Sequence, residues 1–282
     1  MGLRHGAVAL AHTVLDHDLP KLAAALTYFT VLSLFPALVV VIALLGLVGL
    51  SKDALDALLD AVGDLGATWA VDMVSGVLDS IQRSHSSGYA LVIGALVSVW
   101  AASAYIGAFM WASDTIYRVD HHRPSWRGLP LRVGLALLLL GMLTVTAAAV
   151  ALVGPFGEWV ADLTGIGTGV LRLWSWAKWP LLFAFSLLLF DLLYWFAPAR
   201  HQPAPWRLLP GAAVGVVLLM LASAAFSVYL AHFASYNRVY GTLGAGVAFL
   251  VWTWVMNLGL LVGVEVNRTL ERRGDASTAD PA

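Results

Sequence analysis

The chain has 282 residues, of which 60% are hydrophobic and only 12% are charged, and it contains no cysteine. Soluble domains are about 45–50% apolar and about 25% charged, so this composition is typical of a protein whose surroundings are largely lipid. A net charge of −1 gives no overall positive field that would attract nucleic acid. The absence of cysteine excludes disulfides, thiolate metal sites and cysteine nucleophiles.

Six apolar segments are each long enough to cross a bilayer as a helix, which takes roughly 20 residues. They predict an all-α, polytopic membrane protein with six transmembrane helices. A β-barrel is a poor alternative, because its strands are about 10 residues long and alternate in polarity. The six predicted spans are residues 22–50, 89–113, 133–157, 179–197, 208–236 and 239–265.

The segments outside these spans differ in character. Residues 1–20 have one apolar stripe and predict an amphipathic juxtamembrane helix that ends before the first span. The loop 51–88 repeats leucine and valine at helical spacing opposite a row of aspartates, which predicts amphipathic helices lying on the outer surface. Residues 21–272 are expected to form the transmembrane domain, and the small, polar tail 273–282 is expected to be disordered.

Lysine and arginine predict the orientation, because cytoplasmic loops of membrane proteins carry more of them. Six spans place both termini on one side, and the loops of that side hold eleven of these residues against five on the other. We therefore expect both termini in the cytoplasm of a cell with an inner membrane. The eleven are Arg4, Lys21, Arg118, Arg123, Arg127, Arg132, Arg200, Arg207, Arg268, Arg272 and Arg273, and the five are Lys52, Arg83, Arg172, Lys178 and Arg238.

Pro36 interrupts the first span, a few residues after Tyr28 and Ser33. A proline inside a helix removes one backbone hydrogen bond and clashes with the preceding turn. One interpretation is a hinge or partly opened helix that lines a substrate path. The other is a static kink, since proline is common in membrane helices.

Three polar residues lie inside or at the end of apolar runs. An ionisable residue in a membrane helix is costly, so Asp191 is a candidate for a proton or cation site. The alternative is a carboxylate at the inner interface, bonded to a nearby arginine such as Arg200 or to helix ends. Glu265 marks the inner end of the last span, where an interfacial position is favoured. Asn257 is expected to hold helices together more than to bind a ligand.

The densest polar and aromatic cluster connects the last two spans almost without a loop, so these helices are expected to form an antiparallel hairpin. Arg238 is a candidate to bind an anionic headgroup, and the alternative is a tight turn with an exposed arginine. Glycines allow close approach of two helices, and we expect packing at a G-x-x-x-G pair in the fifth span as well. The cluster contains Asn237, Arg238, Tyr240, Gly241 and Gly244, and the pair is Gly211 and Gly215.

Several motifs are absent from the sequence. There is no G-x-x-x-x-G-K-[ST] phosphate loop, no H-E-x-x-H and no G-x-S-x-G, and the eight histidines form no recognisable metal set. We therefore expect no enzyme activity, no cofactor, no metal and no built-in nucleotide hydrolysis. Inverted repeats are typical of transporters, but no convincing internal similarity is evident.

Residues 21–36 (KLAAALTYFTVLSLFP) resemble the first-span signature of the YihY/BrkB family. Residues 237–244 (NRVYGTLG) with 263–267 (GVEVN) resemble its C-terminal signature, and residues 107–126 are similar to its central inner loop. The resemblance covers roughly residues 10–272 and implies six helices in an inner membrane with cytoplasmic termini. Members carry the label ribonuclease BN, which we regard as mistaken, while others are linked to serum resistance and to transport of envelope precursors.

These observations favour a transporter or flippase-like protein for a lipid or envelope precursor. The expected partners are membrane lipids, a lipid-linked substrate and a second copy of the chain in a homo-oligomer, but not nucleic acid. A scaffold for envelope assembly that transports nothing is the alternative. A ribonuclease is least favoured, because the inner loops offer only Asp114 and Asp120 as acids beside their arginines.

Overall fold

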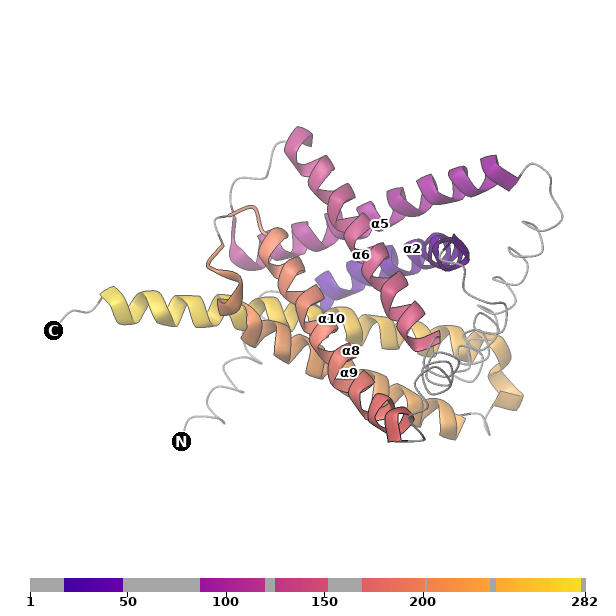
Figure 1. Cartoon of the computed structure of the whole chain (residues 1–282). Coiled ribbons are helices and arrows are strands. Elements are labelled where there is room, and N and C mark those ends of the chain that lie inside the picture. The colour runs from indigo at the N-terminus through magenta and orange to yellow at the C-terminus, as the bar shows by residue number, and fades with distance from the viewer. Residues whose placement is uncertain are drawn as a thin grey trace. The chain divides into compact units, whose positions relative to one another are not determined.

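The structure is a computed structural model that describes residues 18–47, 87–119, 125–151, 169–200, 202–233 and 237–279. Every regular element within these ranges is a helix (Figure 1). The all-α fold predicted from the apolar segments is therefore confirmed. The amphipathic helices expected in residues 1–17 and in most of the loop 51–88 lie outside the described residues.

The helices follow the apolar runs, because a backbone in lipid must satisfy its hydrogen bonds within its own segment. Each α-helix is at least 25 residues long. The elements are α2 (Leu19–Leu47), α5 (Ser87–Tyr117), α6 (Ser125–Ala151), α8 (Gly169–Phe196), the 3-10 helix η1 (Pro205–Arg207), α9 (Leu209–Phe233) and α10 (Asn237–Ala279).

Four helices are long and apolar enough to cross a membrane within the part of the chain that the structure describes. These spans are Leu96–Tyr117, Trp126–Thr146, Leu209–Tyr229 and Gly246–Arg272. Shorter apolar stretches occur in α2, at Leu19–Leu34, and in α8, at Pro180–Phe196. A multi-pass membrane protein follows from these lengths, and the count of six spans stays a prediction.

Several helices extend beyond the apolar runs that predicted them. Helix α6 begins at Ser125, before the first apolar span residue at 133, and α10 continues to Ala279 through part of the tail for which the sequence predicted disorder. A helix that has already nucleated extends at little cost per residue. Hydropathy therefore located the helices but did not locate their ends.

The chain divides into two compact units, and several helices run from one into the other. Unit 1 comprises the described residues within 18–31, 104–132 and 186–279, and unit 2 those within 32–103 and 133–185. Unit 1 thus contains all of η1, α9 and α10 together with one end of α2, α5, α6 and α8. In unit 2, the Ser98 hydroxyl of α5 donates a hydrogen bond to the carbonyl of Pro36 in α2.

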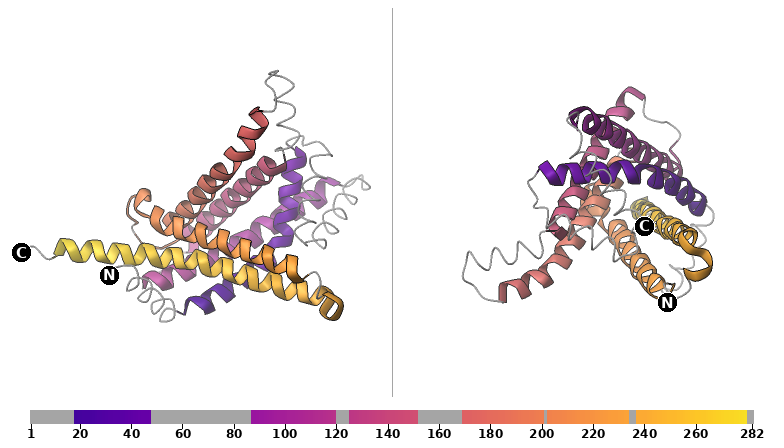
Figure 2. Two further views of the ribbon diagram at one scale, coloured as in Figure 1. Left: turned by 90° about the horizontal axis from the view of Figure 1, so that it is seen from below. Right: turned by 90° about the vertical axis from the view of Figure 1, so that its right-hand side faces the viewer.

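Helices α9 and α10 lie side by side in unit 1 and run in opposite directions (Figures 1 and 2). Only residues 234–236 separate them, as expected for the hairpin predicted from the sequence. A Cβ on Gly263 of α10 would lie 2.6 Å from the carbonyl oxygen of Gly211 in α9, and a Cβ on Gly259 would lie 3.0 Å from the Cβ of Leu218. Gly211 and Gly215 therefore face a second G-x-x-x-G pair, Gly259 and Gly263, which the sequence analysis did not single out.

Candidate functional site

The most buried ionic contact among the described residues lies within α10. Arg268 donates a 3.1 Å hydrogen bond to Glu265, and the two side chains are only 4% and 1% exposed. The two residues are three apart and so occupy one face of the helix. Taking two charges out of water costs several kcal/mol per ion, which only a close partner offsets. The pair therefore stays buried because each residue neutralises the other.

A second ion pair joins α10 to the segment between α8 and η1. Arg200 of this segment donates to Glu271 of α10, and the Arg200 guanidinium carbon lies 4.3 Å from the centre of the Tyr117 ring at the end of α5. A cation over an aromatic face is attracted by the electrons of the ring. The electrostatic interactions of Tyr117 also include Glu265 and Arg268. We name Tyr117, Arg200, Glu265, Arg268 and Glu271 together the charged cluster.

Two further side chains fix the backbone around the charged cluster. Asn267 of α10 accepts a 2.9 Å hydrogen bond from the N–H of Gly211, in the first turn of α9. This is a helix cap supplied by a neighbouring helix, because the first N–H groups of a helix have no partner within it. Asp114 of α5 accepts a 2.6 Å hydrogen bond from the N–H of Ala199. The segment between α8 and α9 is thus held at both of its ends.

Helix α5 ends close to Asp114 in a left-handed cap. Arg118 has a φ of 55°, and the N–H groups of Arg118 and Val119 donate to the carbonyls of Thr115 and Asp114. This pattern is the Schellman motif, which satisfies carbonyls that the helix leaves free at its end. Tyr117 is the last residue of this helix, and its ring lies against the Arg200 guanidinium.

Asp191 of α8 is buried, with 7% of its surface exposed, and its Oδ1 accepts no hydrogen bond from any described residue. Arg200, the arginine considered as its partner, pairs with Glu271, and the alternative of an interfacial carboxylate bonded to helix ends stays a prediction. The nearby Tyr194 does not help Asp191 either, since its hydroxyl donates a 2.8 Å hydrogen bond to the carbonyl of Leu260 in α10.

Asn257 joins three helices of unit 1. Its amide nitrogen donates to Thr30 of α2 at 3.1 Å and to Thr253 of α10 at 3.0 Å, and its oxygen accepts from Tyr105 of α5 at 3.1 Å. Such contacts between membrane helices stabilise by about 1 kcal/mol each. Because both ends of the amide are engaged, the geometry favours the structural role over a ligand site.

The predicted site residues are distributed over both units. Tyr28 is 65% exposed on α2, and Ser33 and Pro36 belong to unit 2. The backbone of residues 237–244 forms the first turns of α10, but the side chains of Asn237, Arg238 and Tyr240 lie outside what the structure describes, as do the surroundings of Gly241 and Gly244. Asp191, Asn257 and Glu265 are buried separately in unit 1.

The sequence analysis missed most of the charged cluster. It counted Arg200 and Arg268 as evidence for orientation and named Arg200 as a possible partner of Asp191, but it assigned no role to Glu271 or Tyr117. A signal for Arg268 exists, because an arginine three residues after Glu265 suits an ion pair on one helix face. The described residues contain no group of three histidine, aspartate or glutamate side chains able to hold a metal.

Comparison with known proteins agrees with this picture of a membrane protein. The sequence matches the family described as Virulence factor BrkB over residues 10–282. The ribonuclease-like protein YfkH of Bacillus subtilis is 25% identical over 94% of both chains. A UPF0761 membrane protein of Stenotrophomonas maltophilia is 29% identical over 93% of this chain, and one of Xanthomonas oryzae is 27% identical over 89%.

The matches differ in length. The aligned region covers 59% of the Stenotrophomonas relative and 57% of the Xanthomonas relative, so each of these proteins has a substantial part that this chain does not match. No solved structure matches. The family match extends over nearly all of the sequence and includes every segment that forms unit 1, and the chain belongs to the BrkB virulence factor family.

Proposed function

We propose that this membrane protein moves a lipid or a lipid-linked envelope precursor across the inner membrane, with both termini in the cytoplasm and without hydrolysing ATP itself. The observation that carries this proposal is the burial of Asp191, Glu265 and Arg268 within the apolar stretches Pro180–Phe196 of α8 and Gly246–Arg272 of α10. Ionisable side chains in membrane helices are expensive and mark the paths of substrates and ions. A bundle that serves only as an anchor gains more stability from apolar side chains at these positions.

A flipping assay in vesicles tests this function. The purified chain is reconstituted into vesicles that contain a fluorescently labelled anionic phospholipid, and dithionite is added outside. We expect quenching of both leaflets with the protein and of the outer leaflet alone without it. Asp191→Asn and Arg238→Ala should slow the quenching of lipid that starts in the inner leaflet. Lys21→Gln, which removes one partner of an exposed ion pair, should not slow it.

The possible outcomes distinguish a wrong function from a wrong assignment of the residues that carry it. Identical quenching in protein-containing and empty vesicles would count against flipping of this lipid. Normal flipping by both Asp191→Asn and Arg238→Ala would keep the function and remove these residues from the substrate path.

A scaffold that transports nothing is the second candidate, and the packing of α9 on α10 favours it. Gly211, Gly259 and Gly263 leave room for direct backbone contact between these helices, and Asn257 joins α10 to two more. A scaffold that acts as a homo-oligomer would stay active in envelope assembly when Asp191→Asn and Glu265→Gln are introduced. Growth under envelope stress, measured with each variant in cells lacking the wild-type gene, separates the two candidates.

Ribonuclease activity is the least supported candidate, although one relative is named as ribonuclease-like. Cleavage of RNA by the purified chain that requires a divalent metal, and that is lost in Asp120→Ala, would establish it against the transport proposal.

A further inference from the structure

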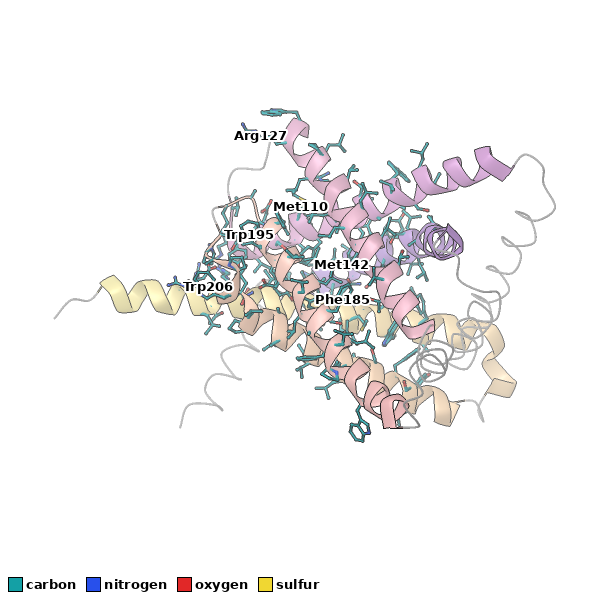
Figure 3. The ribbon with its side chains drawn as sticks, in the orientation of Figure 1. Met110, Arg127, Met142, Phe185, Trp195 and Trp206 are labelled. Carbon is teal, nitrogen blue, oxygen red and sulfur yellow. The ribbon has the colours of Figure 1, made fainter. Side chains whose placement is uncertain are left out.

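Two short sequence motifs occur twice in unit 1. Residues 126–130 read WRGLP and lie in the first turns of α6, and residues 206–210 read WRLLP and run from η1 into the start of α9. In both copies the tryptophan and the arginine are exposed (Figure 3 labels Arg127 and Trp206). The helices that precede them, α5 and α8, each carry an Asp-x-x-Tyr motif, at Asp114–Tyr117 and at Asp191–Tyr194.

A third copy shares the outline of this pattern. Helix α2 begins with Leu-Pro, as do residues 129–130 and 209–210, and α10 carries Glu265 and Arg268 where α5 and α8 carry aspartate and tyrosine. The chain thus divides into three helix pairs, α2 with α5, α6 with α8, and α9 with α10. Repeats of two helices keep the same direction in the membrane, unlike inverted repeats. This pattern of helix pairs differs from the inverted repeats that the sequence analysis looked for.

The repeat makes three acids equivalent, and the structure buries all three in unit 1. Asp114 and Asp191 are 7% exposed and Glu265 is 1% exposed, and they are the buried carboxylates among the described residues. The protein neutralises or bonds two of them. Asp114 accepts the N–H of Ala199, and Glu265 is paired with Arg268 at the position three residues on.

Asp191 has neither kind of partner within the described residues. The position three residues after Asp191, which corresponds to Arg268 in α10, is Tyr194. The Tyr194 hydroxyl already donates its hydrogen bond to the Leu260 carbonyl. Helices α5, α9 and α10 pack on the part of α8 that belongs to unit 1, and they carry other titratable groups. No hydrogen bond or ion pair within the described residues connects these groups to Asp191. These groups are Tyr105, Asp114 and Tyr117 on α5, Tyr229 at the far end of α9, and Glu265, Arg268, Glu271 and Arg272 on α10.

We propose that Asp191 is a proton-binding site, at which the carboxylate takes up one proton to become a neutral carboxylic acid and later releases it. An unpaired carboxylate buried in apolar surroundings is costly, and a bound proton removes its charge. A metal cation is a poorer occupant, because hard cations take several oxygen ligands. The buried neighbours on the same helix, Phe190 and Leu193, supply none.

The use of this proton to drive transport rests on the proposed function, but the site itself does not. Infrared spectroscopy of the whole chain in lipid nanodiscs detects it directly, because a protonated carboxyl has a C=O stretch separate from that of a carboxylate. We expect a band of a buried carboxylic acid that shifts with ¹³C-labelled aspartate and disappears as the pH is raised. The band should be lost in Asp191→Asn.

Asp114→Asn is the matched control, because asparagine keeps the oxygen that accepts the Ala199 N–H. It should retain the band, and both variants should unfold at the wild-type temperature. A band that persists in Asp191→Asn, or that is lost equally in Asp114→Asn, would overturn the assignment. Loss of the wild-type band on addition of Na⁺ at constant pH would assign the site to a metal cation instead. Flipping that fails while the band behaves as expected would reject the transport function alone.

Discussion

Two ion pairs in the chain have the same spacing and opposite surroundings. Asp18 and Lys21 lie 2.8 Å apart with most of each side chain in solvent, whereas Glu265 and Arg268 lie 3.1 Å apart and are almost fully buried. Exposed pairs stabilise by about 0–1 kcal/mol. Removing one partner of a buried pair costs about 3–5 kcal/mol, because the other charge is left without compensation.

We therefore predict that Glu265→Gln lowers the free energy of unfolding by about 3–5 kcal/mol, while Lys21→Gln changes it by less than about 1 kcal/mol. Unfolding in mixed micelles, followed by circular dichroism, measures both. The double variant Glu265→Gln with Arg268→Gln should recover most of the loss. Equal, small effects of both single variants would show that the buried pair contributes no more than the exposed one.

The sequence singled out Asp191, Asn257 and Glu265, which the structure buries, but it did not identify the partners of Asn257 and Glu265. A carboxylate in an apolar run stands out in any sequence, because leucine or alanine would be cheaper there. Which residue pairs with such a carboxylate depends on tertiary contacts. Arg200 and Glu271 are separated by most of α9 and α10, and no local pattern predicts that they meet.

At the scale of the element, helix position was predictable and helix pairing was only partly so. The short connection predicted the hairpin of α9 and α10, since neighbouring helices with short links pack against each other. The matching glycines of α10 were missed because Gly259 and Gly263 are read singly as ordinary membrane-helix residues. Their role depends on what faces them, which is Leu218 for one and Gly211 for the other.

Replacing a glycine at this contact should separate the two helices. A Cβ at Gly263 would lie 2.6 Å from the Gly211 carbonyl oxygen and 3.0 Å from the ring of Tyr194, whereas a Cβ at Gly246, on the same helix, meets no atom within 4 Å. We predict that Gly263→Ala lowers stability by about 1–3 kcal/mol through overpacking. Gly246→Ala should raise stability by up to about 1 kcal/mol through helix propensity. Thermal unfolding in nanodiscs distinguishes them, and a neutral Gly263→Ala would argue against the close contact.

The cap that Asn267 provides to α9 has its own signature. Asn267→Ala removes the acceptor of the Gly211 N–H, and loss of a cap costs about 0.5–2 kcal/mol. Hydrogen–deuterium exchange at the start of α9 should therefore quicken by roughly 2- to 30-fold, the factor that this free energy corresponds to. Asn257→Ala should leave exchange at Gly211 unchanged, because its hydrogen bonds connect α2, α5 and α10. Faster exchange in both variants would show a general loosening and not a local cap.

At the scale of the whole molecule, the orientation predicted from arginine and lysine can be tested cleanly, because the chain has no cysteine of its own. Trp126, Trp176 and Trp206 are each about 70% exposed or more. We predict that a membrane-impermeant maleimide labels Trp126→Cys and Trp206→Cys in inverted membrane vesicles and labels Trp176→Cys in intact spheroplasts. Labelling of Trp126→Cys and Trp206→Cys from opposite sides would contradict both the six spans and the repeat of helix pairs.

The repeat itself shows what hydropathy leaves out. Apolar length reports that a segment crosses the membrane, but every crossing segment looks alike in that measure. The distinguishing residues are the few at the helix ends, and their spacing differs between copies, with three more residues between Tyr194 and Trp206 than between Tyr117 and Trp126. The match became visible once the structure assigned each motif to the end of one helix and the start of the next.

Helix α10 has 43 residues, which at 1.5 Å per residue is about 65 Å, roughly twice the thickness of the hydrocarbon layer. Its last turns, after Arg272, therefore extend beyond the apolar stretch Gly246–Arg272 (Figure 2 shows the long helix). A membrane protein of only 30.1 kDa is a hard target for single-particle imaging. A helical fusion partner joined in register after Ala279 would give a fiducial that the particle alignment can follow.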